Sequence, residues 1–323
     1  MQAVIQTRYG APQVLQLTSQ PKPVPADNEI LVRIVASSVT AADSMMRRGT
    51  PRYGRLFLGL FKPRHPVSGT GFSGVIEASG SAVSRFRIGE AVMGESVLGA
   101  GTHCEYVCVP QDEVICRKPD NLSHAEAATV CDGVVTSSNF LYRLGNVESG
   151  QRVLINGAAG SLGSAAVQLA KCAGATVVAV CGRENHDFVR SLGADEVIDY
   201  NVSDPLQGDE RFDLIYDAVG KLDMRPAMDA LREKGRFLSP VLSLPLLIRV
   251  LLSRLSGSRQ VLFSATGLLP TAERLSLLQG VLPLLEQGRL CISITREYAL
   301  SEIAQAHEYI DTGHKRGNIV VKP

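Results

Sequence analysis

The chain has 323 residues, of which 45% are hydrophobic and 20% are charged, and its formal net charge is +1. Such totals are ordinary for a soluble globular protein and leave room for two domains or one large α/β domain. Because no long basic stretch accompanies this balanced charge, nucleic acid is excluded as the main partner.

The N-terminal stretch MQAVIQTRYGAPQVLQL lacks the charged and then apolar pattern of a secretion signal. The seven cysteines are scattered along the chain, and no two of them form a CxxC pair. Scattered cysteines in odd number are typical of reduced thiols rather than of disulfides or a zinc knuckle. We therefore expect a cytoplasmic protein.

Residues 1 to about 120 carry short β-type runs such as EILVRIVASSV and SGVIEASG, broken by glycine and proline. Frequent glycines suit the tight bends of a barrel-like all-β domain. The stretch DNLSHAEAATV follows, with Ser123 placed to cap a helix and Glu126 three residues later. We place the end of the first domain there.

From Arg152 the pattern alternates between strands and helices joined by short links. This alternation predicts an α/β domain with a doubly wound parallel sheet. The expected strands are RVLINGA, ATVVAVCG, DEVIDY, FDLIYDAVG, GRFLSPV and VLFSATG, and the expected helices are SLGSAAVQLAKCAG and NHDFVRSLG. After them come two helical stretches, TAERLSLLQGVLPLLEQGRL and SEIAQAHEYIDTG, and a final strand, NIVVKP.

The turn in VLINGAAGSLG has glycine at every third position, Gly157, Gly160 and Gly163. A glycine turn between a strand and a helix points backbone N–H groups and the positive end of the helix dipole at one spot, which suits a pyrophosphate. The strand–turn–helix–strand context favours dinucleotide binding, although the order is GxxGxxG and not GxGxxG. The alternative is a structural turn in a ligand-free domain.

The end of the next strand indicates which dinucleotide binds. NAD specificity usually needs an acidic residue at this tip, but the strand ends Val180-Cys181-Gly182-Arg183. The positive charge of Arg183 suits a 2′-phosphate, so we expect the cofactor to be NADP(H). Glu184 lies next to the proposed phosphate pocket, and its negative charge weakens this preference for NADP(H). The alternative for Arg183 is a solvated charge in a loop.

Several segments together resemble the zinc-free quinone oxidoreductase branch of the medium-chain dehydrogenase/reductase superfamily. The resemblance runs nearly end to end and is carried by 37–49, 69–94, 103–110, 150–171, 190–200, 212–220 and 313–321. It implies a GroES-like β-barrel catalytic domain over 1–123 and 268–323, interrupted by a Rossmann NADP(H)-binding domain over 124–267. It also implies a homodimer.

The resemblance also implies which residues hold the cofactor, since they occupy the family's binding positions. Near the pyrophosphate these are Ala159, Gly160, Ser161, Leu162 and Gly163, with Arg183 and Tyr200 at the 2′-phosphate. Near the nicotinamide they are Thr136, Ala218, Val219, Gly220, Phe263, Ser264 and Asn318.

The zinc branch of the superfamily holds its catalytic metal from three places, where this chain has Thr40, Gly69-Thr70-Gly71 and Asp132. One carboxylate does not hold a zinc ion, because a catalytic site needs about three protein ligands. The cysteine lobe of the structural zinc is missing as well, and Cys104 and Cys108 fit a strand better than a metal site. We therefore expect no metal.

Two residues are candidates for catalysis, each with a plainer alternative. Thr40 occupies a position where the zinc-free branch often has Asn. It is placed either to donate a hydrogen bond to a substrate carbonyl or to cap the helix AADSMMRR. Tyr53 is placed to donate from the wall of a cleft, or else is a surface aromatic in a loop. Asp132 caps the following helix or lies in the cleft. His65 and His103 show no dyad spacing, and no general acid is evident.

The segment 241–257, VLSLPLLIRVLLSRLSG, is unusually apolar. It is too short and too interrupted to span a bilayer, so we expect no transmembrane segment. A helix that covers the cleft mouth or packs in a subunit interface is the favoured interpretation. The alternative is an apolar lip that touches a membrane surface.

Together these features predict a zinc-independent oxidoreductase that transfers hydride from NADPH to quinones or α,β-unsaturated carbonyls bound in an apolar cleft. Without a Lewis acid, simple alcohols are poor substrates, whereas conjugated carbonyls spread the developing charge onto oxygen. Two alternatives stay open. Bound zinc would favour a zinc-type alcohol dehydrogenase, and tight cofactor binding without turnover would favour a non-enzymatic NADPH-binding or assembly protein.

Overall fold

The structure, a computed structural model, describes residues 1–96, 101–256 and 258–323. The chain forms two compact units. The first contains Met1–Asp132, Pro270–Glu286 and Ile292–Pro323, and the second contains Gly133–Leu269 and Gln287–Cys291. The chain leaves the first unit after Asp132 and not after residue 123, because helix α3 (His124–Ala128) packs on the strands of the first unit.

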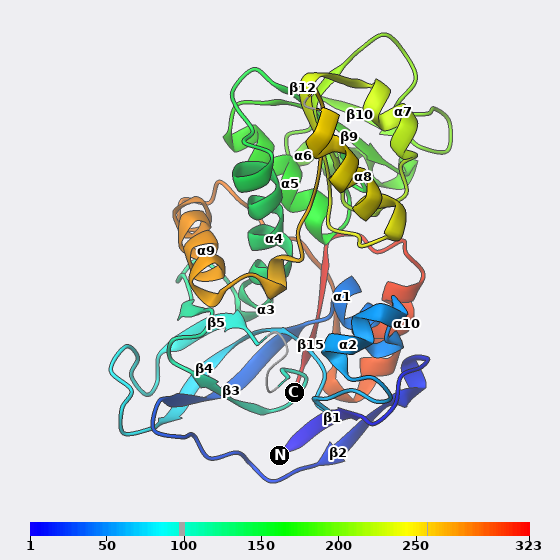
Figure 1. Ribbon diagram of the computed structural model, residues 1–323. Helices are drawn as coiled ribbons and strands as arrows, with labels where there is room; N and C mark the ends of the chain where they lie inside the picture. The colour runs from blue at the N-terminus through cyan, green and yellow to red at the C-terminus, as the bar shows by residue number, and fades with distance from the viewer. Residues whose placement is uncertain (97–100, 257) are drawn as a thin grey trace. The chain divides into compact units, whose positions relative to one another are not determined.

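The first unit is built on a seven-stranded sheet, in which six strands follow the order β14-β15-β3-β4-β5-β7 and β6 pairs with β3 (Figure 1). All pairs are antiparallel except β14 with β15. A separate hairpin joins β1 (Gln2–Gln6) to β2 (Leu15–Ser19). The strands of the sheet are β3 (Glu29–Ser38), β4 (Gly71–Ser79), β5 (Ala91–Glu95), β6 (Tyr106–Pro110), β7 (Ile115–Arg117), β14 (Ile294–Ala299) and β15 (Asn318–Lys322).

Alternating apolar side chains of these strands meet in one core, which includes Ile30, Val32, Phe72 and Val92. Cys108 lies in β6, as the sequence predicted, whereas Cys104 precedes that strand and is buried in the same core. The helices of this unit are α1 (Ala41–Arg48), α2 (Arg55–Leu58), α3, α9 (Thr271–Glu286) and α10 (Ile303–Asp311).

The pairing of β15 with β3 positions the functional part of this unit. Val320 lies opposite Ser38, and the backbone N–H of Val39 donates to the carbonyl of Ile319 at 3.1 Å. Continued by two residues, this antiparallel register brings the loop before β15 to the start of α1. Segments more than 250 residues apart in the sequence therefore meet there.

The second unit holds a six-stranded, fully parallel sheet in the order β10-β9-β8-β11-β12-β13 (Figure 1). This is the strand order 3-2-1-4-5-6 of the predicted doubly wound sheet, and it reverses direction between β8 and β11. The strands are β8 (Arg152–Asn156), β9 (Thr176–Cys181), β10 (Glu196–Asp199), β11 (Phe212–Asp217), β12 (Leu231–Ser239) and β13 (Gln260–Phe263). The helices are α4 (Thr136–Ser138), α5 (Ser161–Cys172), α6 (His186–Ser191), α7 (Met224–Asp229) and α8 (Leu244–Ser256).

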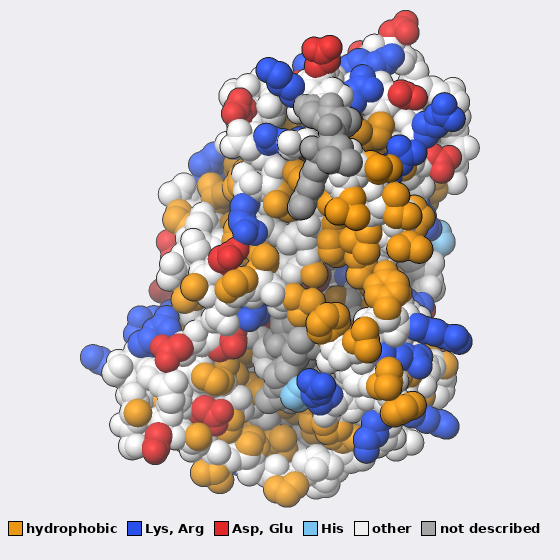
Figure 2. All heavy atoms as spheres, viewed as in Figure 1, with side chains coloured by type: hydrophobic (Ala, Val, Ile, Leu, Met, Phe, Trp, Pro, Cys, Tyr) orange, Lys and Arg blue, Asp and Glu red, His pale blue; other side chains and the backbone are white. Residues whose placement is uncertain are grey.

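Helix α8 covers most of the apolar segment 241–257, whose last residue, Gly257, lies outside the described residues. Leu246 is buried in the core of the second unit, but apolar side chains on other sides of the helix are exposed (Figure 2). These are Leu244, Ile248, Leu251 and Leu252, each at least half exposed. No helix in the described part of the chain is long and apolar enough to cross a membrane.

Candidate active site

The turn between β8 and α5 is held in shape by two of its glycines. Gly157 has a φ of +77°, a conformation that side chains rarely adopt. Gly163 packs so closely that a Cβ there would lie 2.1 Å from the carbonyl oxygen of Gly157. Glycine at 163 therefore lets the first turn of α5 rest directly on the end of β8.

Gly160 has a different function in the turn. A Cβ at Gly160 would meet only the carbonyl oxygen of Gly157, at 3.5 Å, so the space beside it is open. Gly160 is also the N-cap of α5, with extended backbone and no side-chain cap hydrogen bond. The open space therefore lies at the positive end of a twelve-residue helix, where an anionic group is stabilised.

The turn lies at the point where the strand order reverses, which is where such sheets bind ligands. There the buried carboxylate of Asp217, at the end of β11, accepts from Asn156 Nδ2 at 2.8 Å. It also accepts from the backbone N–H groups of Gly220 and Leu222, each at 2.9 Å. Asp217 thereby orders the predicted nicotinamide loop 218–220, a role that the sequence analysis missed although an acid ending a buried strand signals it.

The tips of β9 and β10 carry the residues expected at a 2′-phosphate. Cys181 pairs with Asp199, so Arg183 and Tyr200 follow the same edge of the sheet, and both are exposed. The carboxylate of Glu184 lies over the strand tip, because a Cβ at Gly182 would meet its Oε1 at 2.6 Å. This edge therefore combines a free-standing cation with a nearby carboxylate, as the sequence indicated.

Thr136 begins α4 and is half-buried. Its neighbour Ser137 donates to the carbonyl of Leu162 at 2.8 Å, so α4 lies against the first turn of α5. The structure thus brings Thr136 to the region of the glycine turn.

Phe263 ends β13, and Ser264 follows it with its hydroxyl held by Asn139 Nδ2 at 3.1 Å. Asn318 belongs to the first unit, where it is 7% exposed and donates its backbone N–H to Ser293 at 2.9 Å. A contact between Asn318 and the cofactor therefore stays a prediction.

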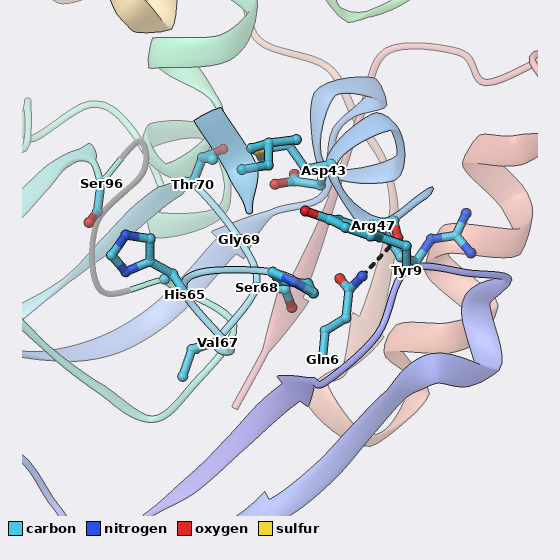
Figure 3. A pocket seen from close by; sticks show the side chains of 14 residues that line it. Gln6, Tyr9, Asp43, Arg47, His65, Val67, Ser68, Gly69, Thr70 and Ser96 are labelled. Atoms are coloured by element: carbon cyan, nitrogen blue, oxygen red, sulfur yellow. Dashed lines mark hydrogen bonds between the residues drawn. The ribbon is translucent and has the colours of Figure 1, made fainter. Parts of the chain in front are cut away.

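A pocket in the first unit lies beside α1 and the strand β4 (Figure 3). Its wall mixes polar and apolar side chains, and Asp43, Arg47 and Thr70 all contribute to it. Gln6 and Arg47 are joined across the pocket wall, since Gln6 Nε2 donates to the carbonyl of Arg47 at 2.7 Å (Figure 3). The other lining residues are Tyr9, Met46, Leu58, Pro63, His65, Val67, Ser68, Gly69, Ser96 and Gly101.

Thr40 caps α1, which is one of the two roles left open by the sequence. Its Oγ1 accepts from the backbone N–H of Asp43 at 3.0 Å and donates to Asp43 Oδ2 at 2.7 Å. The Asp43 carboxylate accepts in return from the backbone N–H of Thr40 at 2.8 Å. With 2% of its surface exposed, Thr40 has its hydroxyl engaged within the cap.

Asp43 is a buried carboxyl, with 3% of its surface exposed. Burial raises its pKa, while His103, the hydrogen bonds from Thr40 and the Lys315 cation act in the opposite direction. Its Oδ1 has no hydrogen-bond partner among the described residues. Asp43 therefore depends on nearby positive charge for its ionised form.

Lys315 lies in the segment 313–321, which carries part of the family resemblance, but the sequence did not single it out. It is half-buried in the loop between α10 and β15, and burial lowers its pKa. The carboxylates of Asp132 and Asp43 oppose that shift through their charges. Charged residues from three distant segments of the first unit therefore influence one another's pKa.

The first unit also contains two buried histidines, His103 and His307. His103 is fully buried, with Nε2 2.9 Å from the carbonyl of Ser38 and Nδ1 2.9 Å from Ser68 Oγ. This pairing fits a neutral ring that donates from Nε2 and accepts at Nδ1. His307 stands edge-on to it, with ring centroids 6.2 Å apart. His65 lines the pocket and is exposed, so the two histidines named by the sequence have separate environments.

Tyr53 lies in a short turn (Arg52–Gly54) and is 45% exposed, as expected for a surface aromatic. Within the described ranges, no three His, Cys, Asp or Glu side chains are grouped so that they could hold a metal ion. At the three zinc-ligand positions, Thr40 has its hydroxyl committed to the cap and Asp132 is the one carboxylate. These donors do not fit a catalytic zinc.

Comparison with known proteins identifies the family. The family model "Alcohol dehydrogenase GroES-like domain" matches residues 26–120, and "Zinc-binding dehydrogenase" matches residues 192–321. The chain is 31% identical to the mitochondrial NAD(P)H oxidoreductase RTN4IP1 of Mus musculus, over 99% of this chain and 89% of that one. It is 28% identical to the chloroplastic NADPH-dependent alkenal/one oxidoreductase of Arabidopsis thaliana, over 100% of this chain and 80% of that one.

Among solved structures, the quinone oxidoreductase from Coxiella burnetii has a TM-score of 0.85 and 30% identity, and the match covers 100% of this chain and 99% of that one. Both units therefore match along their full lengths, in fold as well as in sequence. The protein belongs to the quinone oxidoreductase branch of the medium-chain dehydrogenase/reductase superfamily.

Proposed function

We propose that this protein is an NADPH-dependent, zinc-independent oxidoreductase that reduces quinones or α,β-unsaturated carbonyls. The observation that carries the proposal is the glycine turn at the reversal point of the parallel sheet, with open space at Gly160 and the N-terminus of α5 beside it. The similar proteins from Mus musculus and Arabidopsis thaliana bear the names NAD(P)H oxidoreductase and NADPH-dependent alkenal/one oxidoreductase.

The cofactor would be held mainly by backbone. The turn 157–163 would hold its pyrophosphate, and Arg183 with Tyr200 would flank its 2′-phosphate. When bound, NADPH supplies a hydride. The loop 218–220, which Asp217 orders through hydrogen bonds, would lie against the nicotinamide ring.

Metal-independence is part of the proposal, although one matching family is described as zinc-binding. Thr40, Thr70 and Asp132 offer one carboxylate between them, so these three positions do not supply the donor set of a catalytic zinc ion. The acceptor must then be a carbonyl whose negative charge is already delocalised, as in quinones and enones.

The pocket beside α1 is the proposed place for the acceptor. Its apolar members, such as Met46, Leu58 and Pro63, suit a ring or an alkyl chain, and its polar members suit a carbonyl oxygen. The proposal therefore covers both quinones and enones.

The test is NADPH oxidation by chelator-treated protein, with NADH in parallel, against quinones, enones and simple ketones. We expect turnover of quinones or enones that is faster with NADPH and survives removal of metal. Turnover that disappears with the metal and returns with zinc would favour the alcohol dehydrogenase alternative. Tight NADPH binding without turnover of any acceptor would favour a binding or assembly protein.

We further propose that the protein is a cytoplasmic homodimer and that the exposed apolar face of α8 lies in the subunit interface. This face is a patch of several exposed apolar side chains rather than a single isolated one. The side chains are those of Leu244, Ile248, Leu251 and Leu252. The substitution I248E should therefore convert a dimer to a monomer, which light scattering measures. A protein that stays monomeric but sediments with lipid vesicles through α8 would favour the membrane-surface alternative.

A further inference from the structure

The segment 52–64, RYGRLFLGLFKPR, exposes a group of large apolar side chains on the first unit. Each is more than half exposed, and they are Leu56, Phe57, Leu60 and Phe61. Elsewhere in the described part of this unit, exposed large apolar side chains stand singly, at Leu17, Val24 and Ile88. Single exposed apolar side chains are ordinary, whereas a group of them marks a surface that contacts another molecule.

The charge of this segment is entirely positive. It contains four cations and no acidic residue, and the sequence has no Asp or Glu between 43 and 77. Because the net charge of the whole chain is only +1, these cations form a local concentration of positive charge. Arg52, Lys62 and Arg64 are exposed and form no ion pair with any described residue. Apolar and basic side chains lie next to one another over α2 (Figure 2).

The segment has a defined backbone shape. The N–H of Gly59 donates to the carbonyl of Arg55 at 2.8 Å, and the N–H of Arg64 donates to the carbonyl of Leu58 at 2.7 Å. Tyr9 donates its hydroxyl to the carbonyl of Gly59 at 2.6 Å, and the Arg55 guanidinium lies over the Tyr9 ring, 4.4 Å from its centroid. The apolar side chains are therefore presented by a hydrogen-bonded turn that is fixed to the rest of the unit.

The same stretch of chain also forms part of the wall of the pocket proposed for the acceptor. Leu58 and Pro63 belong to the segment and line the pocket, and His65 lines it directly after the segment (Figure 3). One turn thus contributes some side chains to the pocket and exposes others to its surroundings. A surface that contacts the exposed side chains would lie next to the pocket wall.

An anionic lipid surface matches both properties of the segment. Its headgroups carry the negative charge that the unpaired cations lack, and its acyl region accepts apolar side chains. Phe61 is 88% exposed, so it has little support from neighbouring side chains. A fluid lipid surface closes around such a side chain, whereas a folded protein partner would need a matching pocket with an acidic rim.

We propose that the segment 52–64 docks this protein on an anionic lipid surface, where the pocket receives a quinone that is dissolved in the lipid. The docking depends on the segment alone, whereas the acceptor rests on the proposed function. Stable attachment to a membrane takes two signals, and here basic residues accompany the apolar ones. The acceptor class is accordingly a quinone with a long apolar chain.

The first test is sedimentation with vesicles of phosphatidylcholine that contain about one-third phosphatidylglycerol. We expect the wild-type protein to bind them, to bind pure phosphatidylcholine much less, and to be released by salt, which screens the charges. R52Q/R64Q should weaken binding by about 30-fold, since each cation near an anionic surface contributes about fivefold. F57S/F61S should weaken it by about tenfold or more, because these side chains no longer enter the acyl region.

Matched variants of the same unit serve as controls. V24S/I88S removes two apolar side chains that are 87% and 65% exposed, against 63% for Phe57 and 88% for Phe61. R87Q/R117Q changes the net charge as R52Q/R64Q does, on two other exposed arginines. Both controls should bind the vesicles as the wild type does.

The second test compares two quinones with the same ring under NADPH oxidation. One has a short chain and is water-soluble, and the other has a long alkyl chain and is held in the vesicles. F57S/F61S should reduce the first with the wild-type kcat/KM and the second about tenfold more slowly or worse, because only the second depends on docking. A damaged fold would instead slow both reactions.

Several outcomes would overturn docking by this segment and leave the proposed function standing. They are a wild-type protein that reduces quinones but does not bind the vesicles, binding that is unchanged in F57S/F61S and R52Q/R64Q, and binding that only I248E in α8 abolishes. Dissociation of a dimer by F57S/F61S, without vesicle binding, would show that a second copy covers the segment. A vesicle-bound wild-type protein that reduces neither quinone would contradict the proposed function and leave the docking standing.

Discussion

The glycine turn of the second unit and the Asp43 pocket of the first unit are built in different ways. The turn is one contiguous stretch, Gly157 to Gly163, and what it presents is backbone. The pocket is lined largely by side chains, such as those of Gln6, Asp43 and His65, which come from separate stretches of the sequence. A contiguous backbone site is recognised from its local pattern, whereas a group of distant side chains is recognised from the fold.

The two sites should also fail in different ways. A backbone site is damaged when a side chain is added, and a side-chain site is damaged when one is removed. The four predictions below use this contrast, beginning with the largest expected effect.

Two glycines of the turn should have different roles, since we expect Gly163 to be needed for packing and Gly160 for cofactor binding. A methyl group at Gly163 would lie 2.1 Å from a carbonyl oxygen, so G163A should lower the free energy of unfolding by about 1–3 kcal/mol and abolish NADPH binding. G160A meets nothing closer than 3.5 Å, so it should keep the wild-type stability but weaken NADPH binding by about tenfold or more, roughly 1.4 kcal/mol.

Denaturant unfolding and NADPH fluorescence titration measure these two quantities independently. K322M serves as the control, because Lys322 is exposed and belongs to the first unit. Equal loss of stability in G160A and G163A would contradict the division of roles.

At the 2′-phosphate, we expect side chains to determine the cofactor preference, whereas the rest of the cofactor site is made of backbone. R183Q should raise the KM for NADPH by roughly 10- to 100-fold, since a hydrogen bond to a charged group contributes about 1.5–3 kcal/mol, and leave the KM for NADH nearly unchanged. E184Q should lower the KM for NADPH, because the carboxylate over Gly182 repels a phosphate. Steady-state kinetics with both cofactors checks this, and an R183Q enzyme of unchanged NADPH preference would show that Arg183 is only a surface charge.

The buried histidine behind the pocket should make the first unit sensitive to acid. Burial lowers the pKa of His307 to about 2, so the folded protein keeps this ring neutral while the unfolded chain binds a proton below about pH 6.5. Stability is therefore lost as the pH falls below that value, by about 1.4 kcal/mol per pH unit from this group. H307L should make the slope shallower by about one proton in unfolding measurements from pH 7.5 to 5. An unchanged slope would mean that His307 is protonated in the fold.

The smallest effect is expected at Thr40, where the pocket meets the start of α1. T40A removes the cap and should cost about 1 kcal/mol of stability, while T40S, which keeps the hydroxyl, should cost much less. Because the hydroxyl is engaged by Asp43, kcat should change less than threefold in both variants. A large loss of kcat in T40A with full recovery in T40S at equal stability would restore Thr40 as a substrate donor.

Local patterns were sufficient for most of the elements. All six strands between Arg152 and Phe263 were predicted at their places, because parallel strands buried on both faces are plain apolar runs. Helix α7 and strand β14 were missed, and both are short elements whose sequences, MRPAMD and ITREYA, carry mixed signals. The capping boxes at Ser123 and Thr40 could be recognised because a cap depends on residues three positions apart.

By itself, the sequence determined the alternating order of the elements, the glycine turn and the candidate residues at the strand tips, since each depends on neighbours in the chain. Only the tertiary structure decided that Asp217 orders the loop after β11, that Thr40 is occupied as a cap, and that Asp43 lines a pocket. The physical reason is that charge and burial act through space. The loop before β15 reaches the start of α1 because β15 pairs with β3, a strand almost 280 residues earlier in the sequence.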